Sequence, residues 1–164
     1  MKTGKMGLWV TVFGALILAT SAASAASKGK NVIGGIWEFD AAQSTFTGRP
    51  AYKSAKIVVT AVKGGSKFAG DFTLADGKTM HTEYSGPADG SDIAVTGSPA
   101  FDSVTMLEPD SHTMIRTERR AGKVVGTTIV TLAKNGKSFS ASGRGTLPDG
   151  HPYTFTSVWK RVKK

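Results

Sequence analysis

Apolar and polar residues alternate with a period of two along much of the chain from residue 32 onward. In residues 67–74, Phe68 and Phe72 fall on one side, and Lys67 and Asp71 fall on the other. Alternation of this kind predicts β-strands that each have one buried face. No segment shows a sustained apolar repeat at helical spacing, so the pattern predicts an all-β chain.

Glycine-containing turns separate these strand-like runs. Asp76-Gly77 and Asn135-Gly136 are strong two-residue hairpin signals, for which we expect type I′ turns with positive φ at both central residues. Residues 86–102, with three Gly and two Pro, are expected to form a longer loop that has room for a short strand at 93–96. The other strands are expected after residue 32 and at 53–63, 67–74, 78–85, 103–108, 113–120, 123–133, 138–145 and 153–161.

Strands that follow one another through short turns predict an antiparallel up-and-down meander. Closure of the meander into a lipocalin-like β-barrel of eight or nine strands would remove its exposed edges. An open sheet or a two-sheet sandwich is the alternative. Six aromatic residues on the expected inner faces either line a ligand pocket or fill the core. They are Phe68, Phe72, Tyr84, Phe139, Tyr153 and Phe155.

The first 25 residues have the three-part layout of a secretory signal peptide. Lys2 and Lys5 precede an apolar run at 7–20, and Ala23-Ser24-Ala25 fits the cleavage pattern. A transmembrane anchor is the alternative, but it needs about 20 apolar residues. We therefore expect an exported protein, periplasmic or secreted, without a membrane span after cleavage. Residues 26–33 would then form a polar linker and residues 34–164 a single barrel domain.

Composition narrows the classes of function. The chain has no Cys, which excludes disulfides, cysteine-based zinc sites and a thiol nucleophile. Its formal charge of +9 would fall to +7 on loss of Lys2 and Lys5. The positive residues are mostly scattered, so we expect no specific nucleic-acid binding, although an anionic envelope component remains a potential partner. The basic tail that ends in Lys163-Lys164 is an alternative polyanion site, whose affinity would fall as salt rises. No cofactor is expected.

Short motifs at the two ends of the expected barrel resemble those of lipocalin-like proteins. Gly35-x-Trp37 opens the first strand and Trp159-Lys160-Arg161 closes the last. In such barrels a cation covers the tryptophan ring, and either Lys160 or Arg161 can serve here.

A longer set of motifs is similar to a family of small exported bacterial proteins, described as lipocalin-like and largely without assigned function. That set comprises Ser44-x-Phe46, Asp89-Gly90, Val95-x-Gly97-x-Pro99, Asp102-x-Val104, Gly122-Lys123-Val124-Val125 and Asn135-Gly136-Lys137. The resemblance implies the fold and export, and it implies no catalytic residues.

Arg116, Glu118 and Arg120 alternate on one face of the strand at 113–120. We interpret that face as solvent-exposed, with cross-strand ion pairs that contribute little. If it lines the barrel instead, two cations and an acid would hold an anionic headgroup such as a carboxylate. Met114 shares the face and favours that alternative. Tyr84 and Phe155 complete this set of candidate ligand-binding residues.

Signals for catalysis are sparse. His81 and Glu83 share a strand face, which we interpret as solvated and polar, although the pair would suit an enzyme such as a hydrolase or isomerase. Zinc-binding and nucleophile-elbow motifs are absent. Turn chemistry explains Asp89, Asp92 and Asp102 better than calcium binding does. We therefore predict a non-catalytic barrel that binds a small apolar or amphipathic ligand, or that docks an envelope partner. The loop at 86–102 is the candidate surface for such docking.

Overall fold

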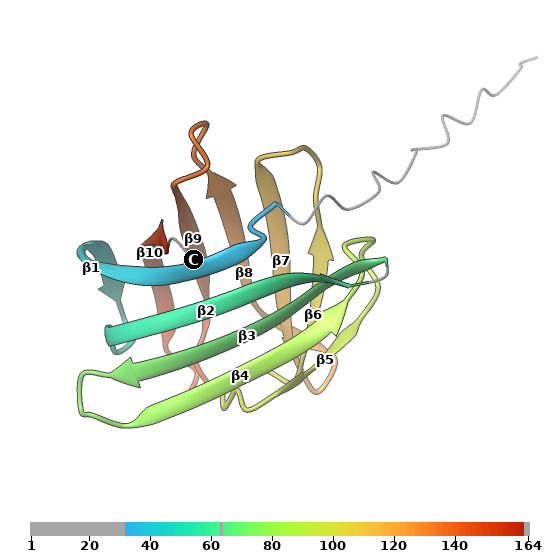
Figure 1. Ribbon diagram of the computed structural model, residues 1–164. Coiled ribbons are helices and arrows are strands. Elements are labelled where there is room, and N and C mark those ends of the chain that lie inside the picture. Colours follow the sequence, from blue (N-terminus) through green and yellow to red (C-terminus); the bar gives the residue numbers. More distant parts are fainter. Residues whose placement is uncertain (1–31, 63, 163–164) are drawn as a thin grey trace, which may run out of the picture.

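The computed structural model describes residues 32–62 and 64–162, and its regular structure in this part of the chain is entirely β (Figure 1). The predicted signal peptide, most of the predicted linker and Lys163-Lys164 lie outside the described residues. Within the described part, the structure contains no helix able to span a membrane. The ten strands are β1 (Gly35–Thr47), β2 (Tyr52–Val62), β3 (Gly65–Leu74), β4 (Thr79–Gly86), β5 (Ile93–Thr96), β6 (Ser103–Leu107), β7 (Thr113–Arg120), β8 (Lys123–Leu132), β9 (Ser138–Thr146) and β10 (Pro152–Arg161).

Each strand pairs antiparallel with its neighbours in sequence, and β1 pairs with β10 to close the barrel. The predicted all-β fold, the meander and its closure are confirmed, and the sandwich alternative is wrong. The predicted count of eight or nine strands is also wrong, because β5 lies inside the segment expected to be a loop. β5 has four residues and only two paired positions with each neighbour, which is too short for its alternation to be distinctive.

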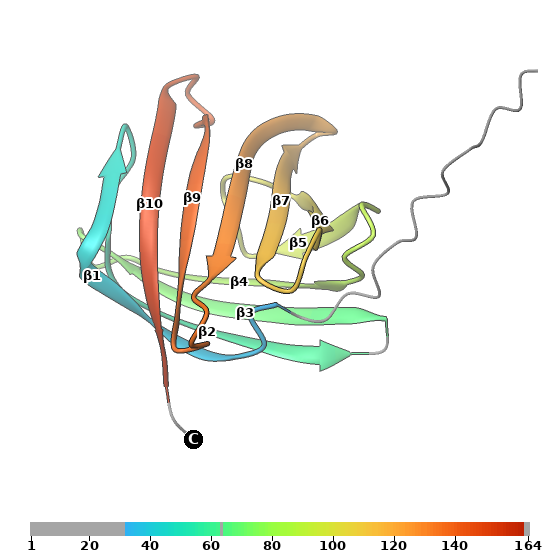
Figure 2. The same cartoon turned by 90° about the horizontal axis from the view of Figure 1, so that it is seen from above.

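The first strand bends to close the barrel. Its first four residues pair with β2, whereas its later residues follow β10 (Figure 2). The bend coincides with a break in the β1–β10 register between Asp40 and Thr45. Ser44 bridges the break, because its Oγ accepts from the Val158 N–H (2.9 Å) and donates to the Asp40 carbonyl (2.6 Å). A bulge of this kind lets one strand belong to both sides of a closed sheet.

The hairpin turns are present, but their predicted type is wrong. Of Asp76-Gly77, only the glycine has a positive φ (84°), and its N–H donates to the carbonyl three residues earlier (3.0 Å). This is a type I turn followed by a left-handed glycine, and Gly136 repeats it. Ala121-Gly122 instead has the two positive φ values of a type I′ turn, 49° and 75°.

One end of the barrel is closed by Trp37, and we call it the Trp37 end. The indole is fully buried and donates to the Ile33 carbonyl (2.8 Å). The guanidinium of Arg161 lies 4.1 Å from the centre of the ring and donates to the carbonyls of Gly34 and Gly136, both at 2.7 Å. A side chain at Gly35 would clash with that guanidinium.

Two of the sequence-predicted details at this end can now be placed. Lys160 does not cover the indole, because its Nζ lies 2.6 Å from an Asp40 carboxylate oxygen. Trp159 is buried inside, and its ring stacks on Phe139. Val32 and Ile33 are also buried, so the packed part of the chain includes two residues assigned to the linker.

Candidate functional site

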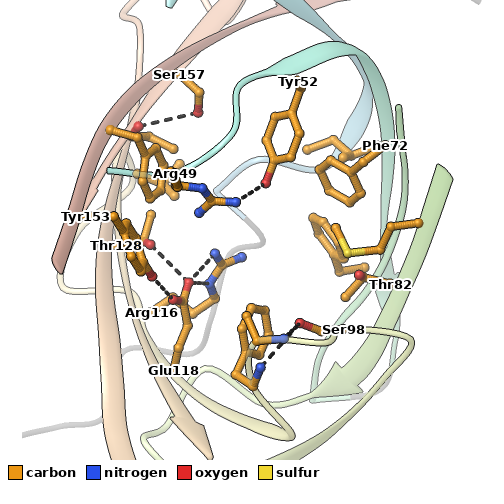
Figure 3. A pocket seen from close by; sticks show the side chains of 18 of the residues that line it. Arg49, Tyr52, Phe72, Thr82, Ser98, Arg116, Glu118, Thr128, Tyr153 and Ser157 are labelled. Atoms are coloured by element: carbon orange, nitrogen blue, oxygen red, sulfur yellow. Dashed lines mark hydrogen bonds and ion pairs between the residues drawn. The ribbon is translucent and has the colours of Figure 1, made fainter. Parts of the chain in front are cut away.

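A cavity of about 260 Å³ lies inside the barrel (Figure 3). It extends from Ile33 toward the opposite end, where turn residues such as Arg49, Phe101 and Leu147 line it. We call that opposite end the Arg49 end. The hairpins that join β1 to β2, β5 to β6 and β9 to β10 meet there, because every second turn of a meander falls at the same end.

The wall of the cavity is mostly apolar and aromatic. All six aromatic residues predicted to face inward line it: Phe68, Phe72, Tyr84, Phe139, Tyr153 and Phe155. Alternation also holds along β4, where Met80, Thr82 and Tyr84 share one face and all line the cavity. The aromatic residues therefore surround a space instead of filling it, which places the predicted candidates Tyr84 and Phe155 at a pocket.

A cluster of five hydrogen-bonded polar side chains interrupts this apolar wall. Arg116 donates to Glu118 Oε1 from Nε (3.1 Å) and Nη2 (2.6 Å), and to the Tyr84 hydroxyl from Nη1 (3.2 Å). Thr128 donates to the same Glu118 oxygen (3.1 Å), and the Tyr153 hydroxyl donates to the other one (3.2 Å). Glu118 is only 3% exposed. We call these five residues the Arg116 cluster.

The solvent-face interpretation of Arg116 and Glu118 is therefore wrong. Both side chains line the cavity, and Met114 beside them is buried, as its place on that face suggested. Arg120 was grouped with them by alternation alone, but it is exposed at the end of β7. The β7–β8 register shifts between Glu118 and Arg119, and Arg120 then pairs with Lys123 at the hairpin turn, beyond the cavity wall.

Two pKa shifts reflect the electrostatics of the cluster. Burial opposes the charge of Arg116, but the oxygens of Tyr84 and Glu118 outweigh it and raise the pKa of the guanidinium. Burial and the negative charge of Glu118 raise the pKa of Tyr153 to about 12. Arg116 is therefore charged and Tyr153 neutral near pH 7, so the tyrosine serves as a hydrogen-bond donor.

The sequence analysis missed Arg49, which follows β1 in the turn at the Arg49 end. Its guanidinium carbon lies between 5.1 and 5.9 Å from the ring centres of Phe46, Tyr52, Tyr153 and Phe155. Its Nη2 also donates to the Tyr52 hydroxyl (2.9 Å). The rings come from β1, β2 and β10, and β10 lies beside β1 only because the barrel closes. No local pattern in the sequence marks this residue.

The candidate acid–base pair lies outside the cavity. His81 is exposed on the outer face of β4, with Nδ1 2.6 Å from Asp71 and Nε2 3.3 Å from Glu83. The hydrogen bond with Asp71, followed by that with Glu83, raises the pKa of His81 above its ordinary value. Neither His81 nor Glu83 lines the cavity. The placement therefore does not support an acid–base pair acting on a molecule held inside the barrel.

The shifted titration of His81 can be measured directly. Because folding raises its pKa, the charged imidazole stabilises the fold below the ordinary value of 6.5, and this contribution is lost as the pH rises through the raised pKa. In an NMR titration His81 should therefore lose its proton above pH 6.5. The variant Asp71→Asn should move the pKa back toward that value, because it removes the strongest partner. A His81 pKa at or below 6.5, or one unchanged by Asp71→Asn, would contradict this assignment.

The remaining predicted polar sites have local structural roles. Asp89 accepts from the Ser91 N–H (2.9 Å), Asp102 from the Ala121 N–H (2.8 Å), and Asp92 lies 3.3 Å from Arg119. Across residues 32–62 and 64–162, no group of three or more His, Asp or Glu is placed to hold a metal ion. In the basic tail, Lys160 and Arg161 are engaged in the contacts described above.

Comparisons with known proteins show no family for this chain. No protein-family model matches it, and no curated protein matches it. Among solved structures it is similar to the zebrafish ileal bile acid-binding protein, determined in complex with cholic acid. The identity is 9% and the TM-score 0.46, over 80% of this chain and 99% of that one. The barrel is established by its own strand pairing, and the resemblance to an exported bacterial family stays a prediction from the motifs.

Proposed function

We propose that this protein is a non-catalytic binding barrel that holds one small amphipathic molecule in its cavity. The observation that carries the proposal is the placement of the Arg116 cluster on the wall of an otherwise apolar cavity. A few oriented polar groups within apolar surroundings are the usual composition of a small-molecule site. The apolar wall would take the body of the ligand, and the polar groups would orient its head.

Unused donors on the wall support an amphipathic ligand over a purely apolar one. Arg116 has five N–H groups and makes three hydrogen bonds within the described residues. The Arg116 side chain is 17% exposed and lines the cavity. A ligand that accepts hydrogen bonds from its remaining N–H groups would therefore stabilise the barrel.

The size of the cavity limits the ligand. Small-molecule pockets commonly measure about 300–1,000 Å³, and this cavity of about 260 Å³ falls just below that range. A medium-length alkyl chain or a single ring system with a polar end suits this volume. Export to the periplasm or medium remains part of the proposal, and it rests on residues 1–25 and on the family resemblance.

The proposal is tested with octan-1-ol as the probe, by isothermal titration calorimetry and native mass spectrometry. We expect one molecule to bind per chain. Ala141→Phe should weaken binding about tenfold or more, because Ala141 lines the cavity and the added ring would occupy ligand space. Ser142→Phe is the matched control, since Ser142 is the next residue of β9 and is exposed.

Circular dichroism would first establish that both variants fold. Saturable binding by the unaltered chain and by Ser142→Phe, with loss in Ala141→Phe, would support the cavity as the site. A lack of saturable binding to both octan-1-ol and octanoate would contradict the proposed function. Equal binding by all three proteins would place the ligand outside the cavity and would also contradict it.

A further inference from the structure

We infer that the ligand is an amphipathic anion and that Arg49 binds its acidic group. This inference rests on the proposed function and specifies the chemical class of the ligand. The charge of the cavity wall leads to it. Three of the lining residues have charged side chains, namely Arg49, Arg116 and Glu118, so the wall has two guanidinium groups and one carboxylate.

The single carboxylate is already committed to Arg116. Three donors occupy Glu118 Oε1, two of them from Arg116, and the Tyr153 hydroxyl occupies Oε2. Arg49 has no carboxylate oxygen within 4.0 Å among the described residues, whereas Arg116 and Glu118 form an ion pair at 2.6 Å. The cavity therefore has one positive charge that no group on its wall neutralises.

The aromatic rings around Arg49 hold its guanidinium without using its hydrogen-bonding capacity. Cation–π contacts engage the charge through the faces of four rings, at 5.1 to 5.9 Å. Among residues 32–62 and 64–162, only one of its five N–H groups makes a side-chain hydrogen bond, the one to Tyr52. Arg49 and Arg116 point into the same space in Figure 3, so the remaining donors of Arg49 are accessible from inside the cavity.

The chemistry of this arrangement favours a carboxylate or a similar planar or tetrahedral anion. A guanidinium presents parallel N–H donors that match two oxygens of one acid group. One unbalanced positive charge fits a monoanion. The surrounding rings and the limited volume then fit a short apolar body, such as a medium-chain carboxylate, with its head toward the Arg49 end.

The test compares octanoate with octan-1-ol, which share an alkyl chain and differ in the head group. Dissociation constants are measured by calorimetry at about pH 7.5, where a carboxylate is ionised. The unaltered protein should bind octanoate about tenfold or more tightly than octan-1-ol, because charge-assisted hydrogen bonds contribute at least that factor. Arg49→Gln should abolish this preference while it changes octan-1-ol affinity less than about twofold.

Two further variants make the result specific. Arg49→Lys keeps the positive charge and should retain a preference for octanoate, which also separates charge from a folding defect. Arg144→Gln removes an exposed arginine of β9, and it should behave like the unaltered protein.

If the unaltered protein binds octanoate no more tightly than octan-1-ol, the inference is overturned and the proposed function still stands. An equal loss of both ligands in Arg49→Gln would also overturn it, and binding of neither probe by the unaltered protein would overturn both proposals.

Discussion

Replacing Glu118 with alanine should lower the free energy of unfolding by about 3–5 kcal/mol, because it leaves a buried charge without its partner. The Glu118 side chain is 4% exposed and that of Arg116 is 17% exposed, so solvent provides little compensation. The hydroxyls of Thr128 and Tyr153 would lose their acceptor as well. Urea denaturation followed by circular dichroism measures the change.

A second variant separates the charge effect from the loss of packing. This variant carries Arg116→Met and Glu118→Leu together, so both charges are removed and neither ion is left unpaired. It should recover most of the unfolding free energy lost in Glu118→Ala. Arg120→Ala is the matched surface control from the same strand, and it should change stability by no more than about 0.5 kcal/mol. If Glu118→Ala lowers the free energy of unfolding by less than about 1 kcal/mol, the buried ion pair does not stabilise the barrel to the extent expected here.

Replacing Trp37 with alanine should cost about 3–5 kcal/mol of unfolding free energy, in the range for large aromatic side chains in a core. The indole is 0% exposed, and it packs in a T-shaped arrangement against Phe139 with the ring centres 4.8 Å apart. Its loss would also remove the surface on which Arg161 stacks and the donor to the Ile33 carbonyl. The Trp37 end of the barrel would then contain a cavity.

The same denaturation experiment measures this loss, with Val124→Ala as the control. Val124 is 58% exposed near the β7–β8 turn, so its truncation should stay within about 0.5 kcal/mol. A Trp37→Ala barrel as stable as the control would show that the Trp37 end does not depend on the indole. Octan-1-ol binding by this variant would report whether the cavity persists when that end is opened.

Most of the fold was predictable because β alternation is a local property. In residues 153–161, alternation places Tyr153, Phe155, Ser157 and Trp159 on one face, and all four line the cavity. The strand at 93–96 was treated as an option within a loop, because four residues cannot distinguish strand alternation from chance. The type of the turn at Asp76-Gly77 was missed because the same residue pair also suits a type I turn with a left-handed glycine.

The candidate site was predictable only in part. Alternation correctly grouped Arg116 with Glu118 on one face of the strand at 113–120. It cannot say which face of the strand is buried when one face has charged residues and the other has both apolar and polar residues. Met114 was the one local signal that pointed inward, and the structure agrees with it. Arg49 carried no signal, because a turn residue has no alternation and its aromatic neighbours include two from β10, about a hundred positions later.

The sequence by itself determined an all-β meander, since period-two alternation and glycine turns act between neighbouring residues. The tertiary structure alone decided which polar groups meet inside. Glu118 reaches Tyr153 because the two residues lie in register across Gly126 of β8 and Gly145 of β9. Arg49 reaches Phe155 only after β1 has paired with β10 and closed the barrel. These contacts join positions far apart in the chain, so they depend on strand register and on closure, which no local pattern encodes. The charge balance of the cavity, on which the proposed ligand class rests, is set by those contacts.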